Sequence, residues 1–149
     1  MSDKNAELLQ DLLEIASDSE NFYRAASGAV ELPFLKNEFA HMADAKGVLV
    51  TELGAHIQAR GEVPDSGGTL AGSLRQSYTE LLAALSQTSA VAHTYASQLE
   101  ESEDRLLEHF DRALVETDSM AVRAVLLTEL PKLRQSHDQM KQLKDTLRD

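Results

Sequence analysis

Carboxylates and one imidazole near the middle of expected helices are the residues best suited to chemistry in this chain. Glu20 and Glu103 each follow a serine at the edge of an apolar stripe. His137 interrupts the stripe of its own helix between Leu133 and Met140. Two carboxylates and a neutral imidazole are ligands that suit iron, manganese and zinc. If the chain binds a metal ion, the candidate ligands are Glu20, Glu103 and His137, with Glu129 or Glu52 completing the coordination shell.

A second interpretation of these residues needs no metal ion. Lys46 interrupts the apolar stripe of its own helix at the same height and brings the positive charge that buried carboxylates require. Ser19 and Ser102 are small and leave room for their neighbours, while Tyr23 and Tyr95 fall on core-facing stripes, where each hydroxyl is expected to find a partner. The sequence thus predicts a buried polar layer that fixes helix register. Its members are Ser19, Glu20, Lys46, Ser102, Glu103 and His137.

The sequence does not contain the complete set of ligands for a two-metal site. Bundles that bind two iron ions use one Glu from each of two helices and a Glu-x-x-His pair from each of the other two. Here Arg134 stands three residues before His137, and Lys46 would repel a metal ion. The one literal Glu-x-x-His, Glu38 to His41, lies off the apolar stripe of its helix. We expect no bound cofactor, with iron or manganese as the alternative.

The elements that must position these residues are predicted from apolar residues at spacings of three and four. No stretch shows the alternation typical of a strand. Thr117 and Asp118 are expected to cap the last helix, and Pro131 within it predicts a kink. Four long stripes cover residues 8–26, 35–57, 91–113 and 122–147, and a shorter stripe covers 70–85.

Four long helices with one apolar stripe each bury those stripes most completely in a four-helix bundle. Short turns join the first pair and the last pair into antiparallel hairpins. The long connection between the second and third helices contains the short helix and allows those two helices to run parallel, as in ferritin-like connectivity. The expectation is one all-α domain over residues 1–149, a ferritin-like four-helix bundle.

Composition narrows the classes of function. Twenty-five acidic against 14 basic residues give a net charge of −11, which repels nucleic-acid phosphates and anionic lipid. Cysteine is absent, which excludes disulfides, thiolate metal sites and a cysteine nucleophile. No apolar run approaches the roughly 20 residues that span a bilayer. Residues 1–7 show no basic region followed by an apolar stretch, so no secretory leader is expected. We expect a soluble cytoplasmic protein that binds neither nucleic acid nor membranes.

Short motifs spread over nearly the whole chain carry a family resemblance. They are residues 18–22, 100–104 and 137–138, together with the crossover run from Gly61 to Gly72, which is the most specific of them. With these motifs the chain resembles an uncharacterised bacterial ferritin-like family of four-helix-bundle proteins of unknown function. Relatives commonly have Gly where this chain has Ser19 and Ser102. The resemblance implies the ferritin-like fold and brings no reaction or cofactor with it.

Two functions stay open at the level of sequence. The first is a non-enzymatic helical module with a stress-related or interaction role, acting as a homo-oligomer or through a protein partner. It predicts a salt-bridged layer without a tightly bound metal ion. The second is a ferritin-like metal protein or oxidase that uses Glu20, Glu103 and His137, and it predicts iron or manganese in the purified protein.

Overall fold

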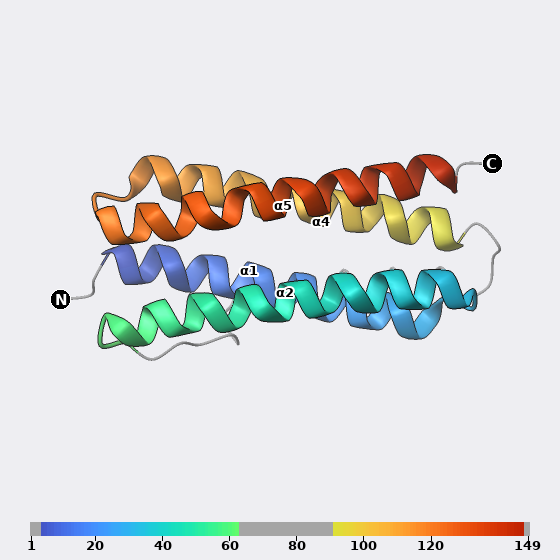
Figure 1. Cartoon of the computed structure of the whole chain (residues 1–149), viewed down its shortest axis with the longest axis horizontal. Helices are drawn as coiled ribbons and strands as arrows, with labels where there is room; N and C mark the ends of the chain where they lie inside the picture. The colour runs from blue at the N-terminus through green and yellow to red at the C-terminus, as the bar shows by residue number, and fades with distance from the viewer. Residues whose placement is uncertain (1–3, 63–90, 148–149) are drawn as a thin grey trace.

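The computed structural model describes residues 4–62 and 91–147 (Figure 1). These residues form four α-helices and contain no strand. The short helix expected at 70–85 and most of the crossover motif at 61–72 lie outside the described residues. The helices are α1 (Lys4–Ala29), α2 (Pro33–Ala59), α4 (Val91–Glu116) and α5 (Met120–Thr146).

The helices form two antiparallel hairpins that lie along one another, α1 with α2 and α4 with α5 (Figure 1). Close packing joins α1 to α2, α4 to α5, and α1 to α4 across the two hairpins. The colour gradient in Figure 1 shows α2 and α4 running in the same direction along the long axis. The described residues therefore form an all-α four-helix bundle, as the sequence predicts. None of the described helices is long and apolar enough to cross a membrane.

Within residues 4–62 and 91–147, the core consists of two apolar clusters, one in each half of the bundle. One cluster includes Leu12, Leu53 and Phe110, and the other includes Phe22 and Phe39. Neither cluster has a member in the middle stretch of any helix, because polar side chains occupy much of the bundle there. The stretches between the clusters are 17–21 of α1, 44–48 of α2, 100–105 of α4 and 134–139 of α5.

The turn between α4 and α5 is tied to the start of α1. Thr117 Oγ1 donates a hydrogen bond to Asn5 Oδ1 at 2.5 Å, and Asn5 Nδ2 donates to Asp118 Oδ1 at 2.8 Å. The expected caps Thr117 and Asp118 thus serve a tertiary contact. The N-cap is Ser119, whose Oγ accepts from the Val122 N–H at 3.3 Å.

α5 continues through Pro131 as one helix from Met120 to Thr146, and the expected kink stays a prediction. The proline ring lies on an exposed part of the helix surface. Proline lacks an amide hydrogen, so the carbonyl four residues earlier receives no helical hydrogen bond from it. On the exposed side of the bundle, water can satisfy that carbonyl, and the helix persists.

Candidate functional site

Three side chains from three helices meet at the centre of the bundle. Lys46 of α2 donates from Nζ to Glu103 Oε2 of α4 at 2.9 Å, and the same nitrogen lies 2.9 Å from Oε1. Tyr23 of α1 donates its hydroxyl to Glu103 Oε1 at 2.6 Å. Both carboxylate oxygens of Glu103 are therefore bonded. We call Tyr23, Lys46 and Glu103 the ion cluster.

The ion cluster is almost completely removed from solvent, with Lys46 2% exposed and both Glu103 and Tyr23 0% exposed. Moving two charges out of water is costly, and the cost is offset only when the charges are close and hydrogen-bonded. Here one ammonium and one phenol hydroxyl supply the bonds to the carboxylate. The cluster is neutral overall, which is the condition under which a core tolerates ions.

Small and polar residues are buried in the same middle stretches of α1 and α4. Ser19 and Ser102 are buried, at the positions where the sequence predicts room for neighbouring side chains. Asp18 is buried as well, although it was not expected in the layer. Its signal was its place in the 18–22 motif rather than its position relative to the apolar stripe. The centre of the bundle is thus more polar than the periodicity of α1 indicates.

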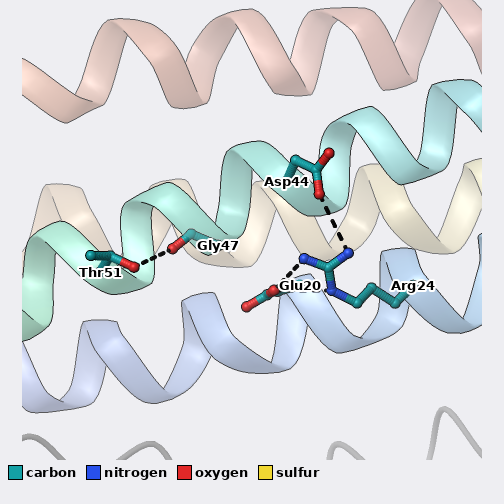
Figure 2. Close-up of polar contacts among 5 residues, drawn as sticks. All are labelled: Glu20, Arg24, Asp44, Gly47 and Thr51. Carbon is teal, nitrogen blue, oxygen red and sulfur yellow. Dashed lines mark hydrogen bonds and ion pairs between the residues drawn. The ribbon is translucent and has the colours of Figure 1, made fainter.

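Glu20 lies outside the ion cluster, on the side where α1 faces α2. Its Oε2 accepts from Arg24 Nε at 3.0 Å and from Nη2 at 2.7 Å, and Arg24 Nη1 reaches Asp44 Oδ1 at 3.4 Å. Figure 2 shows Arg24 between these two carboxylates, with Gly47 of α2 beside Glu20. A Cβ at Gly47 would lie 3.1 Å from Glu20 Oε2, so the glycine makes room for the pair. Thr51 donates from Oγ1 to the Gly47 carbonyl at 3.0 Å on the same helix.

His137 also lies apart from the ion cluster, at the edge between α5 and α4. Its Nε2 is 2.7 Å from Asp104 Oδ1 and 3.8 Å from Glu100 Oε1, and its Nδ1 is 3.3 Å from Asp138 Oδ1. The buried residue of this turn is Ser136. Positions 136 and 137 both lie three or four residues from Leu133 and Met140, so periodicity allows either to face inward. The small neutral side chain is buried, and the imidazole meets the carboxylates of α4.

Glu52 of α2 and Glu129 of α5 form a carboxyl pair on the other side of the bundle. The pKa of Glu129 is raised to about 7, first by burial and then by a hydrogen bond with Glu52 and the charge of Glu52, while Lys132 acts to lower it. Lys132 Nζ lies 3.5 Å from Glu129 Oε1, which is too long for strong compensation. Glu129 therefore carries a proton well above the pH at which an exposed glutamate loses it.

A hollow of about 200 Å³ lies between α2 and α5, next to both the ion cluster and Glu129. Lys46 and Glu129 both contribute to its wall. The remaining wall is largely apolar, which lowers the effective dielectric around Glu129 and agrees with its raised pKa. The other lining residues are Ala45, Val48, Leu49, Lys132, Leu133 and Ser136.

The five expected ligands thus do not converge on one site. Glu20 bonds Arg24, Glu103 bonds Lys46, and His137 bonds Asp104. The fourth and fifth, Glu52 and Glu129, interact with each other. Sequence reasoning missed Glu100 and Asp104 as neighbours of His137; their spacing of four residues on α4 was the available signal.

Comparison with known proteins gives one family. The profile of the family described as "Domain of unknown function (DUF2383)" matches residues 4–116. The chain belongs to this family. Among curated proteins and among solved structures, nothing matches. The residues matched to DUF2383 include all three members of the ion cluster and end before α5.

Replacing Lys46 by Met should destabilise this DUF2383 domain by about 3 kcal/mol, because the buried Glu103 carboxylate loses its counter-ion. Tyr23 alone would then remain as a hydrogen-bond donor to Glu103. Urea unfolding followed by circular dichroism at neutral pH measures the effect.

Lys141→Met is the matched control, since Lys141 is exposed on α5. It should change the free energy of unfolding by less than about 0.5 kcal/mol. Equal stability of the Lys46 and Lys141 variants would show that the ion pair is not required for folding.

Glu129→Gln should make stability less dependent on pH. The folded-state pKa of about 7 lies above the ordinary 4.5, so the stabilisation from protonated Glu129 is complete below about pH 4.5 and is lost as pH rises through 7. Glutamine is neutral throughout. The variant should therefore gain stability relative to the wild type between pH 4.5 and 8, by at most about 3 kcal/mol.

Thermal unfolding across that pH range measures this gain, and Glu31→Gln at an exposed position serves as the control. A Glu129→Gln profile parallel to that of the wild type would mean that Glu129 ionises like an exposed carboxyl group.

Proposed function

We propose that this chain is a ferritin-like four-helix bundle that acts through its surface, as a non-enzymatic interaction module. In the proposal, the ion cluster occupies the mid-bundle position at which metal-dependent bundles place their ions. The observation that carries it is the position of Lys46 Nζ, 2.9 Å from both oxygens of Glu103. An ammonium group in that place performs the charge neutralisation that a metal ion would otherwise perform.

Metal binding at Glu103 would require several changes at once. The ammonium of Lys46 would have to leave a carboxylate that it touches, and its charge would then need another buried partner. Tyr23 would also have to release Oε1 or share it. These costs oppose entry of a cation into the centre of the bundle.

The alternative, an iron or manganese oxidase using Glu20, Glu103 and His137, has less support. A shared ion would have to separate each residue from its partner, respectively Arg24, Lys46 and Asp104. Three ion pairs would be lost for one coordination site.

A role at the surface is supported by apolar side chains at both hairpin turns. Leu32 and Phe34, at the turn between α1 and α2, are mostly exposed, as are Val115 and Met120 near the turn between α4 and α5. Large exposed apolar groups lose contact with water when a protein partner or a second copy covers them. The two turns lie at opposite ends of the bundle (Figure 1).

Aerobic oxidation of added ferrous ion tests the proposal. The rate of ferrous ion oxidation in the presence of the wild-type protein should not depend on Glu103. The comparison uses the wild type, Glu103→Gln and Asp104→Asn, each checked for helical content by circular dichroism. Asp104 is next to Glu103 in sequence and bonds His137 instead of the ion cluster.

Oxidation that is accelerated by the wild type and by Asp104→Asn, and lost in folded Glu103→Gln, would contradict the proposal. Such a result would place redox chemistry at the centre of the bundle. Rates equal to buffer in all three proteins would support a bundle whose centre is closed to iron.

A further inference from the structure

We propose that Glu100, Asp104 and His137 form a binding site for one divalent transition-metal ion, best suited to zinc, at the edge between α4 and α5. One carboxylate oxygen from each acid and one imidazole nitrogen lie within 4.8 Å of one another. The site shares no residue with the ion cluster. It uses the surface of the bundle and is independent of whether the centre binds metal.

The spacing of the donor atoms is close to that of a zinc site. Zinc binds nitrogen and oxygen ligands at about 2.0–2.2 Å, which puts tetrahedral ligands about 3.4 Å apart. His137 Nε2 lies 2.7 Å from Asp104 Oδ1 and 3.8 Å from Glu100 Oε1, one below and one above that distance. Side-chain rotations that lengthen the first distance by about 0.7 Å and shorten the second by about 0.4 Å would bring both to the zinc spacing.

The two helices hold the ligands in place. Glu100 and Asp104 are four residues apart on α4 and therefore project from the same face. His137 comes from α5, which packs against α4 along the hairpin. Three protein ligands leave a fourth position for water, the arrangement of an open zinc site.

The three side chains of the site differ in their exposure to solvent. The Glu100 and His137 side chains are 14% and 20% exposed, whereas that of Asp104 is 51% exposed. An ion can therefore enter from the Asp104 side without opening the bundle. On the inner side, reduced contact with water strengthens its attraction to the ligands.

Neighbouring groups support an imidazole ligand. Asp138 Oδ1 lies 3.3 Å from His137 Nδ1, so that nitrogen can donate to a carboxylate while Nε2 binds the ion. Lys144 Nζ lies 2.5 Å from Glu100 Oε2, which leaves Oε1 for the metal. Three carboxylates against one ammonium around the imidazole leave an excess of negative charge for a divalent cation to neutralise.

Calorimetric titration of the tag-free, full-length protein with zinc chloride tests the site. The wild type should bind one zinc ion per chain. Asp104→Asn and His137→Ala should each weaken binding by at least about 10-fold, since each removes a ligand. Cobalt(II) in place of zinc should give visible absorption bands of a four-coordinate nitrogen and oxygen site, absent in both variants.

Two control variants define the location. His41→Ala removes an exposed histidine from α2, and Glu20→Gln removes a carboxylate that bonds Arg24. Both should bind zinc like the wild type. None of the four substituted residues is buried, so the variants should fold.

Two results would overturn the inference, and they differ in what they mean for the function proposed above. Absence of one-to-one zinc binding by the wild type would remove the surface site and leave the closed centre untouched. Zinc binding retained by Asp104→Asn and lost in folded Glu103→Gln would move the ion to the centre of the bundle and contradict both proposals.

Discussion

The contact between the Lys46 ammonium and the Glu103 carboxylate is the interaction on which the rest of the structure depends. It joins α2 to α4, one helix from each hairpin, and Tyr23 brings in α1. The two apolar clusters end on either side of this layer. Hydrophobic packing alone allows helices to slide by a turn, whereas a buried ion pair must be matched. We infer that the ion cluster fixes the register of the hairpins.

Polar groups farther from the centre follow the same electrostatic rule with different solutions. Glu20 is partly open to solvent and has a flexible arginine as its partner. Glu129, next to the hollow between α2 and α5, has a weak cation contact, and its pKa rises. His137 meets two carboxylates at the edge of α4. A nearby opposite charge keeps Glu20 and Glu103 paired, whereas Glu129, with only a long contact to Lys132, has a raised pKa.

Helical periodicity was sufficient to predict the four helices and the four-helix bundle, because each stripe is long and regular. It also put Lys46, Ser19 and Ser102 on inward faces, where the structure has them buried. It could not distinguish His137 from Ser136, since adjacent residues border the same stripe and side-chain size decides between them. Glu20 and Arg24 are four residues apart on one helix, a spacing that favours an ion pair and was the available signal for that contact. The contact of Thr117 with Asn5 depends on how elements pack, and periodicity could not predict it.

A double-mutant cycle on Lys46→Met and Glu103→Leu measures the central interaction most directly. Each single variant leaves a buried polar group without its main partner, while the double variant replaces both groups by apolar ones. The account predicts that the double variant loses at least about 2 kcal/mol less stability than the sum of the two single losses. Losses that add within about 0.5 kcal/mol would contradict it, because they would show that the two charges stabilise the bundle independently of each other.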